Sequence, residues 1–127
     1  MSGVALVNSS PVIGVVDDDP DVLGSLDSLL RSAGLAARCF AGGALLLASE
    51  DWRSLACIVT DLHMPGMTGL ELLLALREEG ADLPVIMVTA YPTEAVRRQA
   101  EEAGCIAFLT KPVDPDMLLE AIALAIA

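Results

Sequence analysis

The sequence is poor in aromatic and in basic residues. Aromatic side chains make up only 3% of the 127 residues, so the core must be aliphatic, and an apolar fraction of 54% supplies it. Seven basic residues stand against eighteen acidic ones, and a net charge of −11 leaves no basic surface of the kind that binds nucleic acids. We therefore expect a single acidic domain that makes no direct contact with DNA or RNA.

Long apolar runs, a signal peptide and a zinc-binding pattern are also missing. No apolar stretch reaches the roughly 18 residues of a membrane helix, so we expect no membrane span. Residues 1–10 lack the basic region and the length of a signal peptide, and we interpret them as a short loose tail before a domain at 11–127. The three cysteines match no zinc spacing and lie in apolar runs, which predicts buried free thiols and a reducing, cytoplasmic location. They are Cys39, Cys57 and Cys105.

Strand-like and helix-like segments alternate five times along the chain. Short apolar runs bounded by turn residues predict buried strands near residues 11–16, 35–40, 55–60, 84–88 and 105–109. Helices are predicted near residues 20–33, 42–49, 69–79, 93–103 and 115–126. This alternation favours an α/β fold, a doubly wound parallel sheet of five strands with helices on both faces.

Charged and hydroxyl side chains stand at the ends of four predicted strands. They are, in chain order, Asp17, Asp18, Asp19, Asp61, Thr89 and the only lysine, Lys111. Because ligands of open parallel sheets bind at the carboxyl ends of the strands, we expect these groups at one rim of the sheet. Clustered carboxylates repel one another unless a cation joins them, and all-oxygen ligands favour Mg²⁺ (or Mn²⁺). The pattern therefore predicts a metal-dependent phosphoryl-transfer site.

Each of these residues also has a purely structural interpretation. Three acids ahead of Pro20 could cap a helix, although a cap needs only one of them. Asp61 could be a loop acid, Thr89 a turn residue and Lys111 a surface lysine. The joint arrangement favours a site, because four separate coincidences would otherwise be needed.

Four motifs together give the chain a family resemblance. They are Asp17-Asp18-Asp19, the stretch from Thr60 to Gly69, Thr89-Ala90, and Phe108-Leu109-Thr110-Lys111-Pro112. In this order, each following its strand, they resemble the receiver domains of two-component response regulators over residues 11–126. The stretch around Asp61 and the Lys111-Pro112 end are most similar to receivers that carry a C-terminal helix-turn-helix DNA-binding domain. The resemblance implies a flavodoxin-like sheet of strand order 2-1-3-4-5, which places Asp17 and Asp18 beside Asp61.

The resemblance also implies how the acidic residues work. Asp61 accepts a phosphoryl group from a histidine kinase or phosphotransfer protein and forms an aspartyl phosphate. Asp18 and Asp61 hold Mg²⁺ directly, and Asp17 acts through a water molecule. His63, the only histidine, supplies a backbone carbonyl to the metal and no catalytic side chain, since a lone histidine is weak evidence for catalysis. The implied activity is transfer to the protein's own Asp61 and later loss of that group, not turnover of an external substrate.

The remaining motif residues serve the phosphoryl group and the response to it. By resemblance, Thr89 and Lys111 contact phosphoryl oxygens, and a cis peptide before Pro112 aims the Lys111 ammonium into the site. Movement of Thr89 would vacate space for Phe108, the switch residue, although Phe108 could equally be a half-buried strand aromatic. Tyr91, two residues after Thr89, could screen attacking water.

The implied switch acts on the face built from helix 93–103, strand 105–109 and helix 115–126. Repacking there would promote a homodimer or release a C-terminal effector domain, and so control an output such as transcription. The charges at residues 97, 98, 101 and 102 could form cross-pairs in such a dimer, or could be a solvated helix surface.

Other classes of protein share parts of this pattern. Asp17-Asp18-Asp19 contains the Asp-x-Asp spacing of haloacid-dehalogenase-like phosphatases, but Pro20 replaces the usual Thr or Val and the chain is short for that fold. A flavodoxin-like FMN module needs a Ser/Thr/Gly-rich phosphate loop where this chain has three carboxylates. A receiver-like binding module that works without phosphorylation also fits the sequence.

Overall fold

The five apolar runs form one parallel sheet. The strands are β1 (Val12–Val16), β2 (Ala36–Phe40), β3 (Cys57–Asp61), β4 (Val85–Thr89) and β5 (Ala107–Thr110). Their order is β2-β1-β3-β4-β5, which confirms the expected topology. Every residue of β3 and β4 is buried, as continuous apolar strands require in a sheet that is covered on both faces. This computed structural model describes residues 10–127, so nearly all of the expected tail lies outside the described residues.

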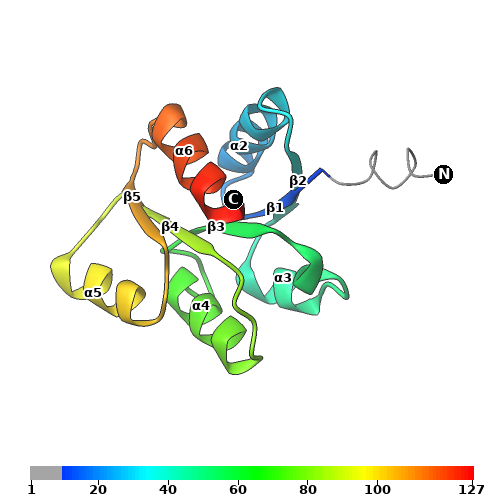
Figure 1. Ribbon diagram of the computed structural model, residues 1–127. Helices are drawn as coiled ribbons and strands as arrows, with labels where there is room; N and C mark the ends of the chain where they lie inside the picture. The colour runs from blue at the N-terminus through cyan, green and yellow to red at the C-terminus, as the bar shows by residue number, and fades with distance from the viewer. Residues whose placement is uncertain (1–9) are drawn as a thin grey trace.

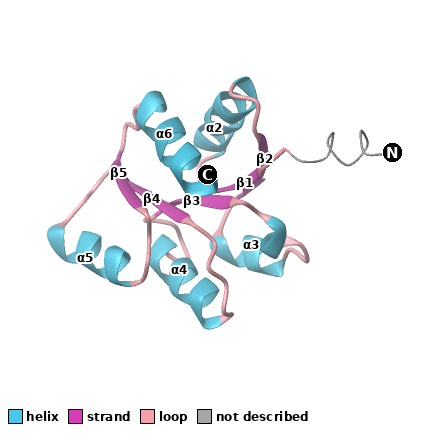
Figure 2. Cartoon of the chain, viewed as in Figure 1, coloured by secondary structure: helices cyan, strands magenta, loops and turns pink. Residues whose placement is uncertain are grey.

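Helices cover both faces of the sheet, as the alternation predicts (Figures 1 and 2). They are α2 (Pro20–Ser32), α3 (Gly43–Ala48), α4 (Gly69–Glu78), α5 (Glu94–Glu102) and α6 (Pro115–Ile126). Helices α2 and α6 lie on one face and α3, α4 and α5 on the other (Figure 1). Each face buries its own aliphatic cluster, centred on Val59 and Leu118 under α2 and α6, and on Leu72 and Met87 under α4. Within residues 10–127, none of the helices combines the length and the apolar character needed to cross a membrane.

Local capping positions the loops that follow β1 and β5. Pro20 begins α2, and the Asp19 carboxylate accepts a hydrogen bond from the backbone N–H of Asp21 at 2.9 Å. Asp114 accepts two backbone N–H groups at the start of α6 in the same way. Gly34 follows α2 with a φ of +82°, which only glycine adopts without strain. Because these ends are set by neighbouring residues, the sequence predicted them closely.

Asp61 and Thr89 are the last residues of β3 and β4. The sequence had predicted that each lies just after the end of its strand. The difference arises from the strand ladder, which continues one residue further than the apolar runs. The Leu62 N–H donates to the Val88 carbonyl at 2.9 Å, and the Lys111 N–H donates to the Thr89 carbonyl at 2.8 Å. Both side chains are therefore held by rigid backbone.

The prediction of three buried thiols was wrong for two of them. Cys57 is buried in β3, and burial raises its pKa to about 12. Cys39 is exposed because it lies in β2, an edge strand with a neighbour on one side only. Cys105 is half-buried in the turn that precedes β5. An apolar run predicts a strand, but it does not say which strand becomes the edge.

Candidate functional site

Three carboxylates meet where β1 and β3 end. These strands are neighbours, and Val16 pairs with Thr60 in their ladder. One oxygen each from Asp17, Asp18 and Asp61 lies within 4.8 Å of the others. Asp17 and Asp61 are only 3% and 7% exposed, whereas Asp18 is exposed. The structure thus brings together the acids that the motifs singled out.

The acidic triplet serves both of the purposes considered from the sequence. Asp19 is the cap of α2, and its N–H donates to Oδ1 of Asp17 at 2.9 Å. Asp17 and Asp18 instead face the carboxylate cluster. The capping interpretation is therefore confirmed for Asp19, and the positions of Asp17 and Asp18 are compatible with the site interpretation.

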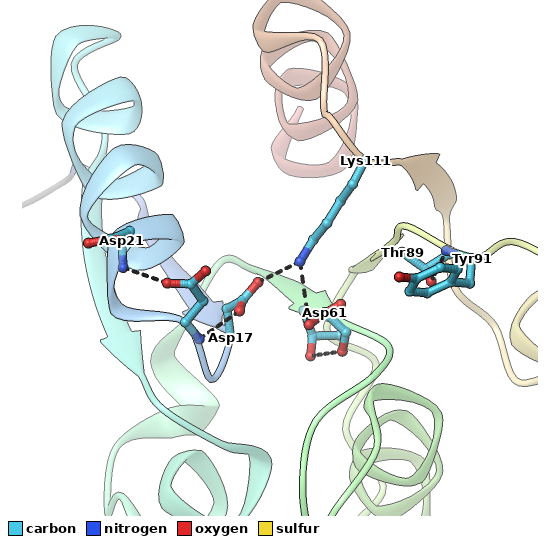
Figure 3. Close-up of polar contacts among 8 residues, drawn as sticks. Asp17, Asp21, Asp61, Thr89, Tyr91 and Lys111 are labelled. Atoms are coloured by element: carbon cyan, nitrogen blue, oxygen red, sulfur yellow. Dashed lines mark hydrogen bonds and ion pairs between the residues drawn. The ribbon is translucent and has the colours of Figure 1, made fainter.

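The only lysine reaches the same cluster from the end of β5. Lys111 Nζ lies 3.1 Å from Oδ2 of Asp17 and 3.4 Å from Oδ2 of Asp61, and Figure 3 shows it extending between them. The Lys111–Pro112 peptide is cis, as the resemblance implied. Burial by itself lowers the pKa of Lys111, but the hydrogen bond and charge of Asp17, with those of Asp61, outweigh it and raise the pKa. The ammonium is therefore held in its charged form.

The site remains short of positive charge. Burial raises the pKa of Asp61 and the charge of Asp17 raises it further, and Lys111 and a backbone hydrogen bond from His63 oppose the rise without cancelling it. One ammonium does not balance three carboxylates. Three oxygens within reach of one point suit a divalent cation, which would supply the missing charge. The acidic pocket is therefore compatible with a divalent metal ion.

The loops after β3 and β4 form the other side of the site. Thr89 is fully buried, and its hydroxyl oxygen accepts a hydrogen bond from the Tyr91 N–H at 3.0 Å, a turn contact as the structural interpretation expected (Figure 3). The rings of His63 and Tyr91 meet edge to face, with centroids 5.9 Å apart. The sequence carried no signal for this ring contact, because it joins two separate loops.

Phe108 is more deeply placed than either sequence interpretation assumed. Its side chain is 8% exposed, and the Arg97 guanidinium of α5 lies 5.0 Å from the ring centroid. The ring is therefore already inside the protein, without any movement of Thr89. Arg97 contacts Phe108 instead of pairing with an acid, and among residues 10–127 no ion pair involves α5.

Gly69 is a site residue that the sequence reasoning missed. A Cβ atom built on Gly69 would lie 2.3 Å from the backbone oxygen of Asp61 and 2.8 Å from the sulfur of Met87. The helix α4 thus packs against the strand end that carries Asp61 only because residue 69 has no side chain. A glycine in the first turn of an otherwise good helix was the available signal.

Comparison with known proteins identifies the arrangement. Residues 13–123 match the response regulator receiver domain. The chain belongs to the receiver-domain family. A receiver domain is the signal-receiving part of a two-component response regulator, and the match decides against the phosphatase and FMN-module interpretations.

The receiver domain is similar to curated response regulators and transcriptional regulatory proteins. It is 36% identical over 115 residues to response regulator protein TodT of Pseudomonas putida. The aligned segment covers 91% of this chain and 51% of TodT. It is 38% identical over 110 residues to transcriptional regulatory protein FixJ of Azorhizobium caulinodans. That alignment covers 87% of this chain and 52% of FixJ. The chain therefore spans about half the length of these relatives.

Solved structures of receiver domains share this fold over more than 90% of the chain. The crystal structure of FixJ-N superposes with a TM-score of 0.83 at 31% identity, covering 92% of this chain and 94% of the other. A CheY-like receiver domain from Methanospirillum hungatei superposes with a TM-score of 0.86 at 30% identity. This superposition covers 93% of this chain and 94% of the other.

Proposed function

We propose that this receiver domain accepts a phosphoryl group on Asp61 from a histidine kinase or phosphotransfer protein. The observation that carries the proposal is the position of Asp61, buried at a strand end with the Lys111 ammonium 3.4 Å from its Oδ2. In the transfer, a carboxylate oxygen of Asp61 forms a bond to phosphorus as the phosphorus–nitrogen bond of a phosphohistidine breaks. The Lys111 ammonium lies beside the oxygens on which negative charge accumulates, and Thr89 adds a hydroxyl donor from the neighbouring strand.

Mg²⁺ (or Mn²⁺) is the metal we propose for the acidic pocket, held by Asp18, Asp61 and the backbone carbonyl of His63. When bound, it would screen the repulsion between the Asp61 carboxylate and the incoming phosphoryl group. We assign Asp17 a contact through water because both of its oxygens are engaged. Oδ1 accepts from the Asp19 N–H and Oδ2 accepts from Lys111.

The acceptor assignment is tested by phosphorylation with Mg²⁺ and either acetyl phosphate or a phosphorylated histidine kinase. Intact mass should show one added phosphoryl group on the native protein and none on an Asp61→Asn variant. Asp82→Asn, which changes an exposed acid in the loop before β4, is the matched control and should label normally. Full labelling of Asp61→Asn would reject the assignment, and no labelling of the native protein would favour a binding module that works without phosphorylation.

The output surface we propose is the face formed by α5, β5 and α6. It exposes Met117 and Leu124 of α6, at 57% and 75%, together with Ile106 before β5 at 50%. Ile106 and Leu124 line one shallow pocket, and exposed apolar side chains of this size are typical of an association surface. Phosphorylation would draw Thr89 towards the new oxygens and change the packing of Phe108 under this face. The expected consequence is a homodimer, or release of a C-terminal output domain that controls transcription.

Sedimentation with and without beryllofluoride, a phosphoryl mimic, tests this output. We expect a larger mass on activation and altered amide exchange across residues 89–126. A Thr89→Val variant keeps the shape of the side chain but removes the hydroxyl, so it should bind beryllofluoride without the change in mass. Unchanged mass and unchanged exchange in the native protein would show that this face is not the output surface.

A further inference from the structure

A cavity of about 530 Å³ lies beside the acceptor site and extends well beyond it. One end is lined by Asp17, Asp61 and Lys111. The remainder lies between α2 and the start of α6, and its walls are aliphatic, with Val22, Leu26, Val113 and Leu118 among them. Its size and its few polar groups at one end match those of sites for small molecules. The chemistry of the phosphoryl group and the metal does not account for the apolar part.

The lining of the cavity restricts what can occupy it. Asp61 and Lys111 line it, whereas Thr89, His63 and Tyr91 do not. A molecule whose phosphoryl group lies between Asp61 and Lys111 therefore has space for its remaining atoms between α2 and α6. Asp17 and Asp21 also line the cavity and would repel a second anionic group, so the remainder of the molecule should be uncharged and apolar.

We propose that this cavity selects small-molecule phosphodonors with an apolar leaving group, such as aromatic acyl phosphates. The inference rests on the proposed role of Asp61 as acceptor. In the step, an oxygen of Asp61 forms a bond to phosphorus and the bond from phosphorus to the acyl oxygen breaks. The carboxylate leaves with the electron pair of that bond, so the step requires neither an external proton nor a redox partner. The aliphatic walls hold the aromatic ring while the phosphoryl group moves.

Competition between benzoyl phosphate and acetyl phosphate tests the inference. Both release a carboxylate, but only the first carries a ring that can enter the cavity. With Mg²⁺ present, intact mass followed over time gives a second-order rate constant for each donor. We expect benzoyl phosphate to be favoured by about tenfold or more, since burying even two methylene equivalents contributes that much.

Two serines of α2 provide matched variants. Ser25 and Ser28 are both exposed, but only Ser25 lines the cavity. Ser25→Trp places an indole ring against the cavity lining and should bring the ratio of the two rate constants towards one. Ser28→Trp should keep the native ratio, and circular dichroism checks that both variants fold.

The outcomes separate this inference from the proposed function. Equal rates for the two donors on the native protein would overturn the inference, although Asp61 would still be the acceptor. The cavity would then be assigned to a side chain of a protein donor. An equal effect of Ser25→Trp and Ser28→Trp would overturn it as well. Absence of labelling by either donor would overturn both proposals.

Discussion

The ammonium of Lys111 donates to the carboxylate of Asp17 at 3.1 Å, joining the end of β5 to the end of β1. The two residues are separated by 94 positions in the chain and by two strands in the sheet. The same ammonium lies 3.4 Å from Asp61, so one cation serves two carboxylates of the site. Asp17 thereby holds Lys111 beside Asp61.

Lys111→Met should slow phosphorylation of Asp61 by about 100-fold, the effect of removing one charged donor from a phosphoryl-transfer site. Methionine keeps most of the apolar length of the side chain but provides no positive charge. The rate of labelling by acetyl phosphate measures the effect. Arg31→Met, which removes an exposed cation paired with Asp27 on α2, is the control and should leave the rate unchanged. A Lys111→Met rate equal to that of the native protein would exclude a role for the ammonium in the transfer.

Asp61→Asn should stabilise the metal-free protein at neutral pH by about 1 kcal/mol, the usual scale of a single substitution. Folding raises the pKa of Asp61, through burial and the charge of Asp17, so the folded state binds this proton more tightly than the unfolded chain. Below the ordinary carboxyl pKa both states are protonated, and the ionisation penalty appears as pH rises through the raised pKa.

Urea unfolding in EDTA, from acidic to neutral pH, measures this difference. The advantage of the variant should be absent in acid and should grow as pH rises. A difference in unfolding free energy that does not change with pH would contradict the assignment of the penalty to Asp61.

Asp18→Ala should abolish Mg²⁺ binding, and Asp17→Ala should weaken it less. Both oxygens of Asp17 are engaged by the Asp19 N–H and Lys111, whereas among residues 10–127 no hydrogen bond or ion pair involves the Asp18 carboxylate. Binding is measured by calorimetry. In the native protein, Mg²⁺ at ten times its Kd should raise the free energy of unfolding by about 1.4 kcal/mol. Asp19→Ala is the control within the same triplet: it removes the cap of α2 and should cost about 1 kcal/mol of stability with little change in Mg²⁺ affinity. Unchanged Mg²⁺ titration of Asp18→Ala would show that the ligand set is wrong.

Gly69→Ala should destabilise the protein by at least about 2 kcal/mol, because the new methyl group would overlap the backbone oxygen of Asp61. Gly24→Ala makes the same chemical change inside α2, where a Cβ meets nothing within 4 Å. Alanine is the better helix former, so this control should gain about 0.5–1 kcal/mol. Denaturant unfolding distinguishes the two, and equal effects would mean that the close packing of α4 on Asp61 is not a constraint.

Tyr91→Ala should shorten the lifetime of the aspartyl phosphate severalfold. The Tyr91 ring contacts His63 edge to face across the loops after β3 and β4, and removing it opens that side of the site to water. Tyr91→Phe keeps the ring and should keep the native lifetime. The measurement is loss of the phosphoryl group after the donor is removed, and equal lifetimes in all three proteins would contradict the screening role.

The sequence by itself determined the fold and which carboxylates lie together. Apolar runs and helix caps are set by residues close together in the chain, so strand order and the starts of α2 and α6 followed from local patterns and the family resemblance. The rule that ligands gather at the carboxyl ends of parallel strands then placed Asp17, Asp18 and Asp61 together.

Only the tertiary structure decided how these residues are paired and buried. The Lys111–Asp17 bond, the contact of Arg97 with Phe108 and the meeting of His63 with Tyr91 join segments far apart in the chain, and no local pattern encodes them. The exposure of Cys39 likewise depends on which strand becomes the edge of the sheet. The cavity between α2 and α6 is lined by residues of both helices and of three strands, and such a space arises from packing between segments rather than from the local sequence of any one of them.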